Sequence, residues 1–93
     1  MAVELDPDFG EAHYNLGRLL QDAGETERAL PHLERAVALN PRLPAAHMAL
    51  GVAYGDLDRI PEAIRKFEQV LHLEPGNANA HRNLQTARDL LKK

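Results

Sequence analysis

A repeat of 34 residues constrains this chain more than any other feature. Pro7, Pro41 and Pro75 stand at that spacing. Residues 7–40 and 41–74 are identical at nine positions in this register, where typical residue frequencies would give about two by chance. The identical pairs are Pro7/Pro41, Ala12/Ala46, His13/His47, Leu16/Leu50, Gly17/Gly51, Asp22/Asp56, Ala29/Ala63, Glu34/Glu68 and Leu39/Leu73. A period of this length indicates one structural unit repeated along the chain.

Within the first period, apolar residues follow the spacing of two amphipathic helices. The face expected to be buried in the first helix consists of Ala12, Leu16, Leu19, Leu20 and Ala23. The face expected in the second consists of Ala29, Leu30, Leu33, Ala36 and Val37. Gly24 between them can adopt the left-handed conformation that ends a helix. Thr26 is the expected N-cap of the second helix, which should end before Pro41.

The second period repeats this design with changes at its turn. Asp58 takes the place of Gly24, and Asp tolerates a left-handed turn. Pro61 is expected in the first turn of its helix, whereas Pro31 lies inside its helix and should bend it. The expected buried residues are Ala46, Leu50, Ala53, Tyr54, Leu57, Ala63, Ile64, Phe67, Val70 and Leu71. Residues 78–93 are expected to form one last helix, with Ala80, Leu84, Ala87 and Leu91 inward.

Short turns between the helices require each pair to be antiparallel. A single helix hairpin cannot bury its apolar face alone, so neighbouring hairpins must stack. The alternation of Ala with Leu suits this, because small residues let helices approach and large residues fill the space beside them. The predicted fold class is therefore all-α, an α-solenoid of antiparallel helix hairpins.

The pattern resembles the tetratricopeptide repeat, a helix–turn–helix unit with this period. The motifs that carry the resemblance are His13-x-x-Leu16-Gly17-x-x-Leu20, Ala29-x-x-x-Leu33 and Pro41, then His47-x-x-Leu50-Gly51-x-x-Tyr54, Ala63-x-x-x-Phe67 and Pro75. The third repeat begins at His81 and departs from the pattern at Gln85 and Arg88. The resemblance implies a right-handed superhelix.

The register divides the chain into parts of a single domain spanning 1–93. Residues 1–7 match the tail of a preceding repeat, 10–43 form the first repeat and 44–77 the second. Residues 78–93 form a capping-like final helix. This register favours an excerpt from a longer array over a short complete adaptor.

The resemblance also implies a peptide-binding groove lined by the first helix of each repeat. Its contacting positions would be Tyr14, Asn15, Arg18, Gln21, Met48, Ala49, Val52, Gly55, Arg82, Asn83 and Thr86. Tyr14, Met48 and Val52 also lie off the Ala/Leu stripe, so we expect them to be partly exposed. The alternative is that Met48 and Val52 only pack between helices. The expected ligand is an extended or helical peptide with an apolar centre and acidic groups meeting Arg18 and Arg82.

Two known kinds of groove fit poorly. Chaperone adaptors of this family hold a peptide carboxylate with Lys, Asn and Arg, but the corresponding positions here hold Tyr14, Arg18, Ala49, Asn79 and Asn83 in a different pattern. Repeats attached to O-linked sugar transferases use a ladder of Asn residues, which Asn15 and Asn83 match and Ala49 breaks.

The recurring histidines, His13, His47 and His81, could suggest a metal site. Equivalent residues on successive repeats stand about 8–10 Å apart, however, whereas metal ligands converge to about 2 Å from one ion. The aromatic character of this position in the family suggests that the imidazoles pack as planar rings. We expect no metal and no cofactor, and a pH dependence of stability is the better expectation.

Several function classes lack their residues. The chain has no Cys and no Ser, so it offers no thiolate and no serine nucleophile, and we expect no enzyme activity. A net charge of −3 without a basic patch argues against nucleic acid. No apolar stretch approaches the about 20 residues that cross a bilayer, so we expect no membrane partner and a cytoplasmic location.

The predicted function is a scaffold that binds a protein or peptide in its groove. The alternative is a structural spacer or self-associating segment of a longer repeat array. Such an array could be attached to an enzyme such as a sugar transferase. In that case the open N-terminal end would allow weak homo-oligomer formation.

Overall fold

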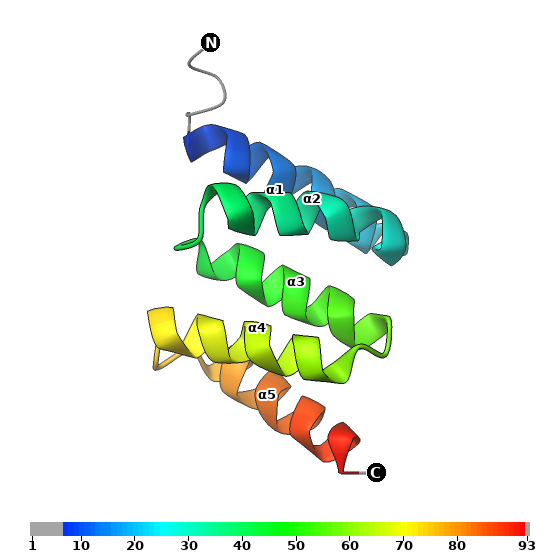
Figure 1. Ribbon diagram of the computed structural model, residues 1–93, viewed down its shortest axis with the longest axis vertical. Helices are drawn as coiled ribbons and strands as arrows, with labels where there is room; N and C mark the ends of the chain where they lie inside the picture. Colours follow the sequence, from blue (N-terminus) through cyan, green and yellow to red (C-terminus); the bar gives the residue numbers. More distant parts are fainter. Residues whose placement is uncertain (1–6, 93) are drawn as a thin grey trace.

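The computed structural model describes residues 7–92, which fold into five α-helices joined by short turns. The helices are α1 (Pro7–Asp22), α2 (Thr26–Leu39), α3 (Pro44–Asp56), α4 (Ile60–Leu73) and α5 (Ala78–Leu91). Figure 1 shows them stacked along the longest axis of a molecule that measures 48 × 28 × 17 Å. Each helix packs mainly against its neighbours in sequence, so α1–α2 and α3–α4 form hairpins and α5 packs on α4. The predicted all-α stack of antiparallel hairpins is confirmed.

None of these five helices is long and apolar enough to cross a membrane.

The turns inside the two hairpins have the predicted left-handed residues. Gly24 has φ 81° and Asp58, one period later, has φ 61°. Pro61 stands in the first turn of α4 and Pro31 inside α2, as predicted. The N-cap prediction for Thr26 is wrong, because α2 begins at Thr26 and makes no side-chain cap hydrogen bond. The preceding residue, Glu25, occupies that position, and its carboxylate accepts from Arg28 at 2.6 Å instead.

Each hairpin closes around a glycine of its first helix. A β carbon on Gly17 would stand 2.6 Å from Leu33 Cδ2, and one on Gly51 would stand 2.6 Å from Phe67 Cε1. Both separations are shorter than carbon atoms can approach, so only glycine lets the two helices lie this close. The repeated glycine of the 34-residue period is therefore a packing requirement of the hairpin.

The core lies between the hairpins. Leu33 of α2, Leu50 of α3 and Val70 of α4 are the largest side chains that are fully buried. Tyr54 of α3 adds a polar link, because its hydroxyl donates to Glu34 Oε2 of α2 at 2.7 Å. Burial and the Glu34 carboxylate raise the pKa of Tyr54 to about 12. This hydroxyl therefore stays protonated, and so a donor, at neutral pH.

The prediction of a fully buried face on α1 is wrong. Leu16 is 43% exposed and Leu19 is 68% exposed, and Ala12 and Ala23 are also exposed. The reason is that among the described helices only α2 packs closely against α1, while α3, which has the equivalent face, packs against both α2 and α4. At the other end Leu91, predicted to point inward, is 56% exposed because it is the last residue of α5.

Residues 1–6 and 93 lie outside the described residues. The prediction that residues 1–7 are the tail of a preceding repeat therefore stays a prediction, as do the repeat boundaries 10–43 and 44–77.

Candidate functional site

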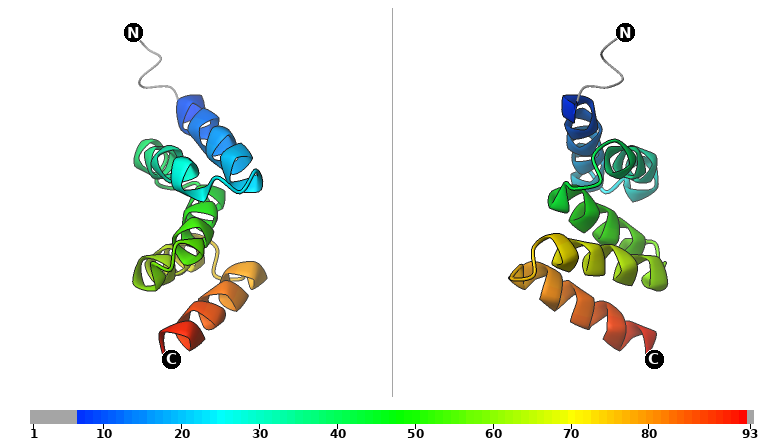
Figure 2. Two further views of the ribbon diagram at one scale, coloured as in Figure 1. Left: turned by 90° about the vertical axis from the view of Figure 1, so that its right-hand side faces the viewer. Right: turned by 60° about the vertical axis from the view of Figure 1, so that its left-hand side comes forward.

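Helices α1, α3 and α5 share one surface of the molecule. Figure 2 shows α2 and α4 on one side of the stack and α1 and α5 on the other, with α3 between them. Two hollows open on this surface, one between α1 and α3 and one between α3 and α5. Val52 and Asp56 of α3 border both of them. We call the surface formed by these two hollows the groove.

The first hollow, which we call the polar hollow, measures about 360 Å³. It is lined by Arg18, Gln21, Asp22, Met48, Ala49, Val52 and Asp56. Gln21 crosses it, because its Nε2–H donates to the carbonyl oxygen of Ala49 at 2.9 Å. Arg18 donates to the Tyr14 hydroxyl at 3.1 Å and lies 4.0 Å from Asp22. Arg18 and Gln21, which line this hollow, therefore already have polar partners within the protein.

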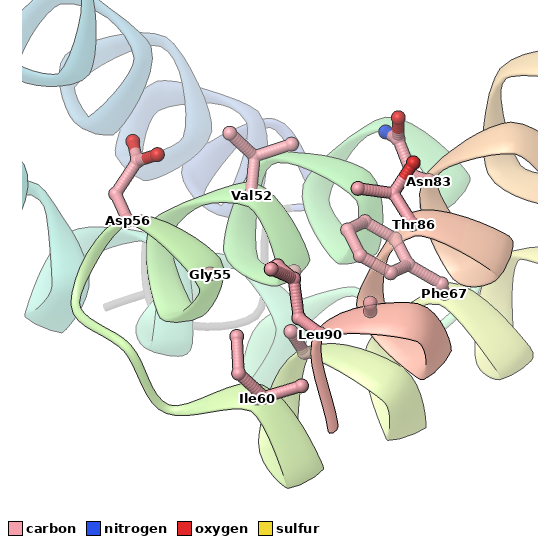
Figure 3. A pocket seen from close by; sticks show the side chains of 11 residues that line it. Val52, Gly55, Asp56, Ile60, Phe67, Asn83, Thr86 and Leu90 are labelled. Carbon is pink, nitrogen blue, oxygen red and sulfur yellow. The ribbon is translucent and has the colours of Figure 1, made fainter. Parts of the chain in front are cut away.

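The second hollow, which we call the Gly55 pocket, measures about 260 Å³ and is mostly apolar (Figure 3). The buried side chains of Ile60 and Phe67 from α4 line it, together with Leu90 from α5. Gly55 leaves it open, because no other side chain or helix lies within 4 Å of where a β carbon would stand. Asn83 and Thr86 of α5 border it on the polar side.

The structure distributes the predicted groove residues unevenly. Those that border one of the two hollows are Arg18, Gln21, Met48, Ala49, Val52, Gly55, Asn83 and Thr86. Those that border neither are Tyr14, Asn15 and Arg82. Ala49 is only 4% exposed, so its side chain offers little surface to a partner. Thr86 donates its hydroxyl to the backbone oxygen of Arg82, one turn earlier in α5.

Two contacts between predicted groove residues connect neighbouring repeats. Asn83 of α5 donates to the Sδ atom of Met48 of α3 at 3.4 Å. This contact and the Gln21 bridge both cross from one first helix to the next. Met48 is half-buried, so it takes part in packing while still bordering the polar hollow. Met48 therefore packs in part between helices, whereas its contact with a peptide stays a prediction.

Sequence reasoning missed several residues that line the groove. Phe67 was assigned to the core alone, and Ile60 and Leu90 were not assigned at all. Asp22 and Asp56 were recognised as a repeated pair but were given no role. Helical spacing could have found Leu90, which lies four residues after Thr86, and Asp56, which lies four residues after Val52.

The recurring histidines lie in three different environments. His13 stacks on His32 with ring centroids 5.6 Å apart, and burial followed by the His32 charge lowers its pKa. His47 is buried, and its Nε2–H donates to the Pro41 carbonyl at 2.8 Å. His81 is exposed and donates in the same way. Within residues 7–92 no three histidine or carboxylate groups are placed to hold a metal ion.

The pKa of His47 is lowered, and burial is the largest cause. The hydrogen bond to the Pro41 carbonyl raises this pKa by less than burial lowers it, and the positive charge of Lys66 lowers it further. The Nδ1 atom of His47 is buried and has no hydrogen-bond partner among the described residues. A proton there would have no acceptor, so the neutral ring is favoured.

The family model described as tetratricopeptide repeat matches residues 2–41 and 14–78. Among solved structures, YrrB, a TPR protein with an unusual peptide-binding site, is 30% identical with a TM-score of 0.86. That match covers 89% of this chain and 43% of YrrB, so this chain spans less than half of that relative. No curated protein sequence matches the chain.

Two further structures hold chaperone peptides. The first TPR of Spaghetti (RPAP3), bound to the HSP90 peptide SRMEEVD, is 27% identical with a TM-score of 0.86 over 96% of this chain and 68% of that one. The second TPR domain of human RPAP3, in complex with the HSP70 peptide SGPTIEEVD, is 28% identical with a TM-score of 0.81 over 85% and 66%. Because the family model covers most of its length and its hairpins match these structures, the chain belongs to the tetratricopeptide repeat family.

Proposed function

We propose that this chain is a protein–protein interaction module that binds a peptide segment in the groove of α1, α3 and α5. The observation that carries the proposal is the continuity of the groove, since Val52 and Asp56 border both hollows. A peptide laid across α3 would therefore contact two hollows in succession. The similar structures that hold peptides support this reading of the fold.

The peptide is expected to differ from a chaperone tail. Arg18, at a position that the family's carboxylate-binding grooves use, already contacts Asp22 and Tyr14. Ala49, at another, is buried. We therefore propose that recognition does not depend on a terminal carboxylate. The proposal assigns no catalytic role to the groove. Its two carboxylates, Asp22 and Asp56, each end a helix and are exposed to solvent.

The test replaces Val52, the apolar residue common to both hollows, with a polar one. Peptides would first be selected from a phage library of random linear peptides, using the wild-type chain. Val52→Gln should weaken binding of the most enriched synthetic peptide about tenfold, because apolar contact with α3 is lost. Val37→Gln is the matched control, since Val37 of α2 is also half-buried but borders neither hollow. Equal losses in both variants, or no selected peptide, would contradict the proposal.

A second function is favoured by the exposed face of α1. The equivalents of Leu16 and Leu19 on α3 are Leu50 and Ala53, which are 1% and 0% exposed because a preceding hairpin covers them. We propose that the α1 face packs against another repeat, as in a segment of a longer array. The isolated chain should then self-associate weakly, because an apolar face of this kind is unfavourable in water.

Sedimentation equilibrium tests this second function. Association should be lost when Leu16 and Leu19 are both replaced by Gln, and retained with Leu91→Gln, which changes an equally exposed leucine of α5. A wild-type chain that stays monomeric at all concentrations would contradict it.

A further inference from the structure

The Gly55 pocket lies where the two repeats differ, and one of the differences is at residue 55. Gln21 and Gly55 stand one period apart in the sequence. In the first repeat, the Gln21 side chain crosses from α1 to the Ala49 carbonyl of α3. In the second, the equivalent crossing would run from residue 55 to the carbonyl of Asn83 on α5, but glycine has no side chain to make it. No side chain of residue 55 therefore crosses the space between α3 and α5.

Gly55 has no structural reason to be glycine. It lies within α3, where glycine is less favourable than other residues, and its φ is not positive. No neighbouring helix approaches it, in contrast to Gly51, against which Phe67 packs. A longer side chain would fit there and would strengthen the helix. Helix packing gives this glycine no role other than leaving the pocket open.

The size and lining of the pocket indicate what enters it. Its volume of about 260 Å³ is below the about 300–1,000 Å³ of sites that hold whole small molecules, so a single side chain suits it better. Ile60, Phe67 and Leu90 present an apolar lining. Burial of an apolar side chain against such a lining is favourable.

The charge beside the pocket is negative. Asp56 borders it and is the last residue of α3, where the helix dipole already places partial negative charge. Among the described side chains no Lys or Arg forms an ion pair with Asp56. Asp22 holds the same position at the end of α1, across the polar hollow. A positive charge on a ligand beside the pocket would therefore be stabilised.

We infer that the Gly55 pocket is the anchor subsite of the groove, taking one apolar side chain of a bound peptide whose adjacent Lys or Arg faces Asp56. The inference rests on the proposed peptide-binding function and specifies the ligand of that site. It also revises the expectation of acidic groups meeting Arg18 and Arg82. Arg18 contacts Asp22, and Arg82 borders neither hollow, so the charges nearest the open pocket favour a basic partner.

The test fills the pocket without removing any residue that packs. Gly55→Gln adds the side chain that the first repeat has at Gln21, and it should reach the Asn83 carbonyl in the same way. Gly76→Gln is the matched control, because Gly76 is also a glycine with open space around it, but it lies between α4 and α5 and borders neither hollow. Asp56→Asn removes the charge while keeping the shape.

The probe is again the most enriched peptide from the random phage library, synthesised and measured by isothermal titration calorimetry. Enriched sequences should share an apolar residue next to Lys or Arg. The peptide should bind Gly55→Gln about tenfold more weakly or worse, although this variant melts at a higher temperature than the wild type. Asp56→Asn should weaken binding severalfold and reduce its salt dependence, and Gly76→Gln should leave binding unchanged.

Three outcomes would overturn the inference. Unchanged affinity in Gly55→Gln would show that the peptide binds elsewhere, and loss in Gly76→Gln of the same size would show an effect unrelated to the pocket. Enriched peptides with acidic residues beside the apolar one would contradict the role of Asp56. If no peptide is enriched at all, the proposed function fails together with the inference. If the enriched peptide loses affinity in Val52→Gln but not in Gly55→Gln, the proposed function stands and the role of the Gly55 pocket is rejected.

Discussion

At the scale of single residues, Gly51 and Gly55 show that the same residue type has opposite consequences four positions apart in one helix. A β carbon on Gly51 would stand 2.6 Å from the Phe67 ring, whereas one on Gly55 would meet no neighbour within 4 Å. The sequence marks Gly51 as part of the repeat, because Gly17 stands one period before it. Gly55 breaks the repeat, and only the structure shows that the break leaves a pocket.

Alanine substitutions at these two glycines should therefore change stability in opposite directions. Gly51→Ala should lower the free energy of unfolding by about 1–3 kcal/mol, because Phe67 is buried and has little room to move. Gly55→Ala should leave it unchanged or raise it by up to about 1 kcal/mol through helix propensity. Urea unfolding followed by circular dichroism measures both, and equal effects of the two substitutions would contradict the packing described here.

His47 is a residue whose protonation opposes folding. Its pKa in the folded chain lies below 6.5, chiefly because it is buried. Well above pH 6.5 both the folded and the unfolded chain hold the neutral ring, so pH has no effect through this group. Below that value the unfolded chain takes up the proton first, and stability falls until the pH passes the folded pKa. His13, whose pKa is also lowered, acts in the same direction.

Stability of the wild-type chain should therefore fall as the pH is lowered from about 7.5 towards about 5.5, by at most about 1.4 kcal/mol per pH unit for each histidine. His47→Phe keeps a planar ring in this place and should reduce the slope. Its control is His81→Phe, which changes an exposed histidine with the same hydrogen bond to a proline carbonyl. A slope that His47→Phe leaves unchanged, or reduces no more than His81→Phe does, would show that burial of His47 does not set the pH dependence.

At the scale of helices, periodicity predicts which elements form, and the neighbours of each element decide what it buries. The hairpins and their left-handed turns at Gly24 and Asp58 follow from local residue patterns, so they were predictable. The exposure of Leu16 and Leu19 was not predictable, because a helical face is buried only when another helix covers it, and no pattern within α1 reports that. The cap of α2 was mispredicted because Glu25 pairs with Arg28 through its side chain.

At the scale of the whole molecule, stacking of repeats creates the groove, and the residues that differ between repeats determine which side chains line it. The family resemblance predicted which helices line it, and eight of the predicted residues border the two hollows. It could not predict the contribution of Ile60 and Phe67, since these residues come from α4, the second helix of its repeat, and meet α5 at the pocket only in the folded stack. Leu90 lies on α5, where helical spacing from Thr86 could have indicated it. We therefore propose that the selectivity of the groove arises where the repeats are unlike, at Gln21 against Gly55.

The central claim is that a peptide lies in this groove with an apolar side chain in the Gly55 pocket. The most direct measurement is an NMR experiment on the wild-type chain with the library-selected peptide, recording intermolecular nuclear Overhauser effects to methyl groups. We expect contacts from one apolar peptide residue to Val52, Ile60 and Leu90, three of the methyl-bearing residues that Figure 3 shows around the pocket. Contacts to methyl groups of α2 and to the outer face of α4, with none to these three residues, would contradict the account.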